Sequence, residues 1–231
     1  MKLIHNDIKL HAYIKSYKIN DLFSTDVSQH MKLFHFTQGD YIYQEDDELS
    51  YFFFFVDGKA KVFNSLSNGK SHLLSFYEPL EVLGDIEIIT KDKVTVNVKV
   101  ISDAYCIGIH TDYIKQNLLT DTLFLQFLCF HLGKKLNRCS KNSSINLLYP
   151  LENRLASYIL AIETREFNTN NTLTFYDSLT EISELLGTSY RHLLRIINTF
   201  IEKGILIKGT NGYEVIDKRQ LQEMGTDLYT N

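Results

Sequence analysis

The stretch of residues 178–198, SLTEISELLGTSYRHLLRIIN, constrains the fold of this chain more than any other. Ser178 and Glu181 have the spacing of a capping box, which predicts that a helix begins at this point. Gly187 supplies the left-handed conformation that ends a helix. Between these residues, an apolar face recurs at helical spacing and consists of Ile182, Leu185 and Leu186.

A second helix is predicted directly after the glycine. Thr188 or Ser189 can cap its start, and its buried face consists of Leu193, Ile196, Ile197 and Phe200. The outward face of its first turns has hydrogen-bond donors and cations, namely Ser189, Tyr190, Arg191, Arg195 and Asn198. Two helices joined in this way form a helix-turn-helix, whose second helix enters a DNA major groove. We therefore expect DNA contacts from Ser178, Thr188 and the outward face.

The residues that follow predict a two-stranded wing. Lys203 to Ile207 ends the helix and opens a strand, Gly209 to Gly212 makes a turn, and Tyr213 to Ile216 forms the return strand. Paired amphipathic helices also occur in proteins that never touch DNA. The wing favours the DNA-binding interpretation, because helix, helix and hairpin together make a winged helix-turn-helix.

The overall charge does not indicate a nucleic-acid-binding protein. The 231 residues include 24 Lys and Arg against 28 Asp and Glu, a net charge of -4, so any DNA contact must depend on local placement of cations. The sequence has no signal peptide and no apolar run of about eighteen residues, so we expect a cytoplasmic protein with no membrane partner. Three widely spaced cysteines, Cys106, Cys129 and Cys139, predict reduced and mostly buried thiols.

The first half of the chain predicts short helices followed by an antiparallel β-structure. Mixed helical spacing predicts short helices in residues 1–31. Between Leu33 and His110 the apolar period is two, and turn-forming Asp and Gly separate strands that we place at residues 41–43, 51–56, 60–63, 72–77 and 94–100. Many short strands with evenly spaced turns predict an antiparallel sandwich or barrel. Strand alternation predicts that two of the four phenylalanines in residues 52–55 fill the core and two lie outside under a helix, rather than forming a ligand-stacking platform.

A long helix is predicted over residues 121–144. Its stripe of Leu125, Leu128, Leu132 and Leu136 would pair with a second subunit or pack as an ordinary core helix. Residues 146–149 predict a hinge, Pro150 starts a helix over residues 151–166, residues 168–172 a polar loop, residues 173–175 a strand and residues 221–229 a tail. This gives three parts: a roll over residues 1–120, a dimerisation helix and hinge over residues 121–148, and the winged helix-turn-helix over residues 149–231.

An α+β chain with this order of elements resembles the CRP/FNR superfamily of bacterial transcription regulators. The resemblance extends from Leu22 to Asp217 and depends most on Gly39-Asp40, Asp57-Gly58, Asn68-Gly69, Leu83-Gly84-Asp85 and residues 179–207. It implies a homodimer without enzymatic activity that reads a palindromic site in double-stranded DNA, with RNA polymerase as a further partner.

The roll departs from the family's cyclic nucleotide site. In the family a Gly-Glu pair holds the ribose and an Arg neutralises the cyclic phosphate; the matching positions here are Gly84-Asp85 and Val94-Thr95. A valine cannot neutralise a phosphate, and burying that charge without a partner would cost several kcal/mol. We therefore do not expect cyclic AMP. The candidate effector residues are Gly84, Asp85, Ile86, Val94 and Thr95, and nearby Lys91 and Lys93 are expected to be exposed.

Metal cofactors are not expected either. The iron-sulfur branch of the family uses an N-terminal cysteine cluster, whereas this chain has no cysteine before Cys106. Haem is not excluded by residue type, because His30, His35, His72, His110 and His131 are present, but these histidines are scattered and none has a metal-ligand spacing such as HxxxH. The effector therefore stays unidentified at the level of sequence.

The recognition helix departs from the family in one further respect. Similar helices often begin Ser-Arg-Glu and have an Arg one turn later; the matching residues here are Ser189, Tyr190, Arg191 and Arg195. Arg195 can bind guanine O6 and N7, whereas Arg191 replaces a Glu that would accept from cytosine N4. We expect a half-site that differs from the familiar TGTGA and TTGAT.

Three functions remain open. The first is a homodimeric regulator controlled by a signal at the roll, and the second is a constitutive DNA-binding regulator whose roll only stabilises the dimer. The third, a cupin-type metalloenzyme, would need an HxH motif with a further Glu and His between Leu33 and His110, which the sequence lacks. Oxidation of Cys129 and Cys139 across a dimer axis would in addition lock one state.

Overall fold

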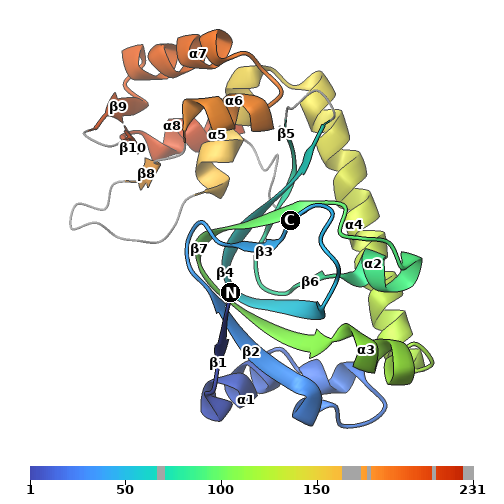
Figure 1. Ribbon diagram of the computed structural model, residues 1–231. Coiled ribbons are helices and arrows are strands. Elements are labelled where there is room, and N and C mark those ends of the chain that lie inside the picture. Colours follow the sequence, from blue (N-terminus) through green and yellow to red (C-terminus); the bar gives the residue numbers. More distant parts are fainter. Residues whose placement is uncertain (67–70, 163–172, 176–177, 210–211, 226–231) are drawn as a thin grey trace. The chain divides into compact units, whose positions relative to one another are not determined.

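The computed structural model describes residues 1–66, 71–162, 173–175, 178–209 and 212–225 (Figure 1). The chain has an α+β fold. Its contacts divide it into two compact units, one made of Met1–Val62 and Tyr77–Asn137, the other of Phe63–Phe76 and Arg138–Asn231. The two units are described one at a time below.

The roll is built on a seven-stranded sheet with the order β1-β2-β7-β4-β5, in which β3 also pairs with β7 and β6 with β4 (Figure 1). The pairs β1–β2, β2–β7, β3–β7 and β4–β6 are antiparallel, as predicted. The strands are β1 (Lys2–Ile4), β2 (Met31–Phe36), β3 (Tyr41–Tyr43), β4 (Tyr51–Ser65), β5 (Ser71–Tyr77), β6 (Glu81–Leu83) and β7 (Asn97–His110).

Two strands are longer than predicted. β4 runs through Asp57 and Gly58, and β7 runs through Ser102 and Asp103, at points where the sequence analysis placed turns. Gly58 has a φ of +96°, and a Cβ at this position would lie 2.5 Å from the carbonyl oxygen of Asp103. The glycine therefore permits a close approach between two continuous strands and does not end either of them.

The four phenylalanines of β4 are all buried. Phe52 and Phe54 lie in the main core, where the Phe52 ring contacts Phe124 with ring centroids 5.7 Å apart. Phe53 packs instead edge-on against Phe34, at 5.3 Å. The prediction that these residues serve packing is confirmed, and Phe124 is the helical residue that covers the pair at positions 52 and 54.

The helices of this unit surround the sheet. They are α1 (Asp7–Ser16), the 3-10 helices η1 (Ile19–Leu22) and η2 (Ser28–His30), α2 (Asp85–Thr90), α3 (Thr111–Tyr113), the π-helical turn η3 (Ile114–Leu118) and the long helix α4 (Thr122–Leu148), which continues into the second unit. The predicted N-terminal helices are correct only in part, because β1 pairs with β2. The predicted turn at Gly84-Asp85 is the start of α2, with Gly84 as its N-cap.

The second unit holds the C-terminal elements α5 (Leu151–Ala161), β8 (Leu173–Phe175), α6 (Leu179–Leu185), α7 (Tyr190–Glu202), β9 (Leu206–Lys208), β10 (Tyr213–Val215) and α8 (Lys218–Gly225). The last three strands form a sheet in the order β8-β10-β9, which contains the predicted wing. The predicted polar loop at residues 168–172 and the predicted end of α5 lie outside the described residues.

Residues 218–225 form a helix where the sequence analysis expected a tail. The carboxylate of Asp217 accepts a hydrogen bond from the Gln220 amide at 2.9 Å, which caps the helix, and Leu221 is fully buried. One buried leucine leaves too little apolar periodicity in the sequence to predict a helix. Within the described residues, no helix combines the length and the apolar character that crossing a membrane requires.

Candidate nucleic-acid interface and roll site

The recognition helix α7 has the predicted division into two faces. Ser189 is its N-cap, and the Ser189 hydroxyl accepts a hydrogen bond from the His192 amide at 3.2 Å. The predicted inward side chains are all buried, and they are Leu193, Ile196, Ile197 and Phe200. This amphipathic packing fixes the rotation of α7 and therefore fixes which side chains face outward.

The outward face presents unpaired donors. Ser189, Arg191, Arg195 and Asn198 are exposed, and the Tyr190 side chain is 48% exposed. Within the described part of the chain, neither the Arg191 nor the Arg195 guanidinium has an ion-pair or hydrogen-bond partner. The two arginines lie one helical turn apart, a spacing at which side chains of a helix are neighbours.

The other two predicted contacts lie on the turn and on the first helix. Thr188 is half-buried, with its Oγ1 3.4 Å from His192 Nδ1. Ser178 is the N-cap of α6 and is exposed, but its side chain makes no capping hydrogen bond to a described residue. The hydroxyl half of the predicted capping box is therefore wrong. Water can satisfy the amides at this exposed helix end, so the helix starts at the predicted position without that bond.

The turn between α6 and α7 is closed by backbone hydrogen bonds. Gly187 has a φ of +62°, and its amide donates to the Glu184 carbonyl at 2.9 Å. The Thr188 amide donates to the Ser183 carbonyl, also at 2.9 Å. These bonds satisfy carbonyls at the end of α6, as predicted for a glycine at this position.

Arg154 of α5 holds the same turn from outside, and the sequence analysis did not identify it. Its Nη1 donates to the Leu186 carbonyl at 2.7 Å, and its Nε donates to the Tyr149 carbonyl at 3.2 Å. One guanidinium thus joins Tyr149, which precedes the N-cap of α5, to Leu186, the C-cap of α6. In the sequence, Arg154 is marked only by its position next to Leu155 of the apolar stripe. That position does not reveal that its guanidinium binds the Leu186 carbonyl, 32 residues away.

The sheet of the wing contains a stacked aromatic pair, and one of its members lies near the first residue of the recognition helix. The Tyr213 ring of β10 stacks on Phe175 of β8 with centroids 5.4 Å apart. Burial raises the pKa of Tyr213, and the nearby Tyr190 hydroxyl raises it further. Tyr190 is the first residue of α7, so the start of the recognition helix lies near the wing.

The predicted effector residues in the roll do not form one exposed surface. Gly84, Asp85 and Val94 are buried, whereas Ile86 is 41% exposed and Thr95 is exposed. Lys91 and Lys93 are exposed, as predicted.

The protein's own side chains cover Gly84. A Cβ at Gly84 would lie 2.9 Å from the Tyr43 hydroxyl and 3.1 Å from Leu49. The Tyr43 hydroxyl donates to the Tyr51 carbonyl at 2.5 Å and lies 3.3 Å from the Leu83 carbonyl oxygen. The backbone at the start of α2 is therefore enclosed by the roll.

Asp85 forms a buried ion pair with Lys135 of α4. Lys135 Nζ lies 2.5 Å from Asp85 Oδ1 and donates to the Val82 carbonyl at 2.8 Å. Burial alone would lower the pKa of Lys135, but Tyr77 and Asp85 outweigh it and raise the pKa, so the lysine is charged. Sequence analysis missed Lys135, although it continues a helical row of buried residues with Leu128 and His131.

The row containing Lys135 corrects the predicted stripe of α4. Leu128 is 1% exposed and belongs to the core of its own unit, Leu125 and Leu132 are half-buried, and Leu136 is 72% exposed. Leu128 therefore serves the core of its own unit, whereas Leu125, Leu132 and Leu136 keep accessible surface, so the stripe is divided between the two predicted uses. The inward row of α4 also contains His131 and Lys135, which an apolar pattern does not select.

The outer face of α4 contains other apolar and small residues. Phe130 is 63% exposed, Cys129 and Gly133 are exposed, and a Cβ on Gly133 would meet open space. The prediction of mostly buried thiols is wrong for Cys129 and Cys139, which are exposed, and correct for Cys106, whose pKa burial raises.

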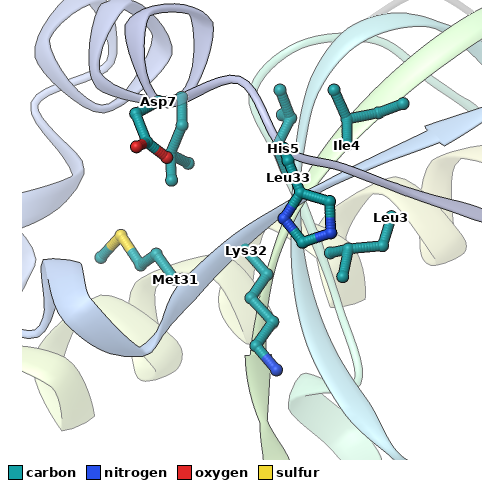
Figure 2. A pocket seen from close by; sticks show the side chains of 8 residues that line it. Leu3, Ile4, His5, Asp7, Met31, Lys32 and Leu33 are labelled. Atoms are coloured by element: carbon teal, nitrogen blue, oxygen red, sulfur yellow. The ribbon is translucent and has the colours of Figure 1, made fainter.

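An open hollow of about 200 Å³ lies elsewhere in this unit, between β1, α1 and β2. Figure 2 shows Leu3, His5 and Lys32 on one side of it, and Asp7 and Met31 on the other. None of the predicted site residues lines it. In the described ranges, no group of three or more His, Cys, Asp or Glu is placed to hold a metal ion.

Comparisons with known proteins agree with this arrangement. Residues 33–121 match the model of the cyclic nucleotide-binding domain, and residues 153–224 match the model of the Crp-like helix-turn-helix domain. The chain is 36% identical over 208 residues to the regulatory protein YeiL of Escherichia coli O157:H7, which covers 90% of this chain and 92% of YeiL. The chain belongs to the CRP/FNR family of transcription regulators.

Solved structures show that this CRP/FNR family member shares its fold with distant relatives. TTHA1359, a CRP/FNR transcriptional regulator of Thermus thermophilus, superposes with a TM-score of 0.68 at 15% identity, covering 84% of this chain and 97% of that one. The c-di-GMP responsive regulator CLP of Xanthomonas campestris superposes with a TM-score of 0.64 at 13% identity, covering 82% and 95%. At these identities the likeness concerns the fold alone.

Proposed function

We propose that this CRP/FNR regulator acts as a homodimer without catalytic activity and reads a palindromic operator in double-stranded DNA through α7. The observation that supports it is the pair of exposed, unpartnered guanidiniums of Arg191 and Arg195 on a helix whose opposite face is buried within the described unit. Arginine is the side chain best suited to bidentate binding of guanine or phosphate. Asn198, one turn further along, adds an amide that can bind adenine.

The proposed half-site follows from these side chains. Two arginines one turn apart favour guanine at two positions of the site, or one guanine and one phosphate, because neither can accept a hydrogen bond. Each bidentate base contact discriminates by about 1–3 kcal/mol. We therefore propose a half-site different from TGTGA and TTGAT.

The proposed dimer uses the outer face of α4. Phe130 and Leu136 are exposed apolar side chains, and Gly133 between them leaves room for a second backbone. A twofold pair of such helices presents each recognition helix twice, which matches a palindromic site. The proposal replaces the stripe predicted from sequence, because Leu128 of that stripe is in the core. Contact with RNA polymerase stays a prediction.

Selection from a pool of random double-stranded DNA tests the DNA-binding proposal. Purified full-length protein is expected to enrich a palindrome with guanine at the positions facing Arg191 and Arg195. Recovery of TGTGA or TTGAT half-sites would reject the proposed half-site. Enrichment of an unpaired half-site by a monomer, or no enrichment at all, would reject the dimeric reader.

Cysteine cross-linking tests the dimer face. Cys129 is exposed on the same side of α4 as Gly133 and Leu136. Mild oxidation with peroxide is expected to give a disulfide-linked dimer on a non-reducing gel, and Cys129→Ser is expected to prevent it. The same gel decides whether oxidation across the dimer axis occurs; only monomer from wild-type protein would exclude it.

The arrangement of the roll favours the constitutive alternative over control by an effector. Asp85, which occupies the position of a ribose-binding residue in the resemblance, already pairs with Lys135. The relative CLP responds to c-di-GMP, so the fold is compatible with a nucleotide effector. For this chain we propose no effector. The Lys135–Asp85 ion pair occupies the candidate effector position instead.

A further inference from the structure

We propose that Lys135 acts as a built-in replacement for an effector: by pairing with Asp85 inside the roll, it holds α4 in its DNA-binding-competent rotation without any small molecule. The inference rests on the proposed DNA-binding function. It makes Lys135 a positioning residue, because the lysine acts through α4 and does not touch DNA in this account.

The contacts of Lys135 show what it holds together. Asp85 lies in the first turn of α2, Val82 lies in β6, and both accept from the one ammonium group of α4. The same Nζ lies 5.6 Å from the centre of the Tyr77 ring of β5. One side chain of the long helix therefore contacts three consecutive elements of the roll.

The pair is enclosed, so the link does not depend on solvent. Asp85 is 1% exposed and the Lys135 side chain 13% exposed. Asp85 Oδ2 is buried and has no hydrogen-bond partner within the described residues, so Lys135 is the group that compensates this carboxylate. Removal of either partner would leave an uncompensated buried charge, which is strongly unfavourable.

The surrounding charges make the lysine harder to replace. Glu81 and Glu87 are both buried next to the pair, and burial together with the Asp85 charge raises the pKa of Glu87. His131 lies near the pair on the same helix, and burial lowers its pKa. Lys134, the next residue to the pair on α4, has its Nζ 5.7 Å from the centre of the Phe130 ring and also lowers the pKa of His131. Lys135 therefore faces three carboxylates, and its loss would favour separation of residues 81–90 from α4 by charge repulsion and hydration.

The pair holds the rotation of α4 together with Phe124 and Leu128, the core residues of the same helix. With Lys135 inward, Gly133 and Leu136 face outward and complete the proposed dimer face. A helix freed from the roll could turn, and Leu136 could then be buried in its own subunit. A bound effector can favour one arrangement only through differential affinity for it; here an internal ion pair supplies that preference, as part of the fold.

Binding of the selected operator by protein freed of small molecules tests the proposal. Wild-type protein is purified from denaturant, refolded and shown by mass spectrometry to hold no ligand; fluorescence anisotropy with the operator then measures its affinity. The variants are Lys135→Met and the double variant Asp85→Asn/Lys135→Met. The matched control is Lys93→Met, which removes a roll lysine whose Nζ lies 3.7 Å from Glu48 in an exposed pair.

The expected result separates positioning from simple stabilisation. Wild type and Lys93→Met bind the operator equally without ligand. Lys135→Met binds about tenfold or more weakly, within the usual range of coupling between distant sites. The double variant removes the Asp85 charge that Lys135 compensates and regains most of its thermal stability, yet it stays about tenfold weaker because the link from α4 to Asp85 and Val82 is gone.

Three results would overturn the inference. Wild-type protein that needs an added cell extract to bind its operator has an effector, and Lys135 is not its replacement. Wild-type affinity in Lys135→Met, or in the stable double variant, would show that the pair is structural only. If the DNA selection failed, the proposed function would be rejected. That result differs from the others, which are measured with an operator that the wild-type protein has been shown to bind.

Discussion

The roll and the recognition helix use their charged side chains in opposite ways. In the roll, Lys135 is buried and donates to Asp85 and Val82. On α7, Arg191 and Arg195 are exposed and have no partner within the described residues. A buried, paired cation fixes one arrangement of its own chain, whereas an exposed, unpaired one remains available to an external anion. The comparison separates charges that are used within the chain from charges that remain available to a partner.

Arg154 lies between these extremes. Its guanidinium binds two backbone carbonyls, those of Tyr149 and Leu186, and it is only half-buried. It therefore resembles Lys135 in being used within the chain, although it belongs to the DNA-binding unit. Variants of Lys135, of Arg154 and of the two α7 arginines test this comparison. Substitution of a cation that pairs within the chain should lower stability, and substitution of an exposed one should lower DNA affinity.

The largest effect on stability is expected from the buried pair. Lys135→Met leaves Asp85 uncompensated and should lower the free energy of unfolding by about 3–5 kcal/mol, measured by urea unfolding. Asp85→Asn/Lys135→Met removes both charges and should recover most of that loss. Lys93→Met, at the exposed pair, should change stability by less than about 1 kcal/mol. If Lys135→Met were as stable as the wild-type protein, the buried pair would contribute no more to stability than an exposed one.

The next effect is expected at Arg154. Arg154→Gln loses hydrogen bonds from a charged donor to the Leu186 and Tyr149 carbonyls, and should lower the free energy of unfolding by about 1.5–3 kcal/mol. Arg219→Gln is the matched control, because Arg219 of α8 is 89% exposed and pairs with Glu223. An equal, small effect of both substitutions would show that Arg154 contributes no more than a surface arginine.

Substitutions on α7 should affect DNA binding without affecting folding. Arg191→Ala and Arg195→Ala should each weaken binding of the selected operator by about 1–3 kcal/mol, while the free energy of unfolding stays within about 0.5 kcal/mol of wild type. Anisotropy titrations and urea unfolding measure the two quantities on the same samples. Arg219→Ala controls for net charge. If the substitutions lowered the free energy of unfolding and left the operator affinity unchanged, these arginines would act within the chain, as Lys135 and Arg154 do.

The smallest effect is a pH dependence at His131. Burial lowers the pKa of His131 in the folded protein, so the unfolded chain binds more protons and stability falls as the pH drops through about 6.5. His131→Phe should flatten that part of the profile, measured as the urea midpoint between about pH 7.5 and about pH 5.5. A profile identical to wild type would show that other groups near the pair dominate it.

Local patterns gave the DNA-reading end almost completely. The buried face of α7, the left-handed Gly187, the cap at Ser189 and the wing strands are all confirmed. Each depends on residues within a few positions of one another, so helical and strand periodicity suffices to predict it. The Ser178 hydroxyl bond failed because an exposed helix end does not need it.

The roll was predicted only in outline. The continuous strands β4 and β7 depend on Gly58 lying against Asp103, a contact between residues far apart in the chain. The same applies to the helix α8, whose Leu221 is buried by tertiary packing. Turn-forming residues and weak periodicity are ambiguous until the neighbouring strand or helix is known.

Sequence alone determined that the chain has a β-roll, a long helix and a winged helix-turn-helix, and which face of α7 points outward, because amphipathic periods encode them locally. The tertiary structure decided which side of α4 is inward. Lys135 is a surface residue by composition, and only the fold brings it to Asp85, 50 positions away in the chain, where burial makes their pairing strong. That long-range pairing is why the sequence left Asp85 as a candidate effector residue, whereas the structure shows its carboxylate paired with the protein's own Lys135.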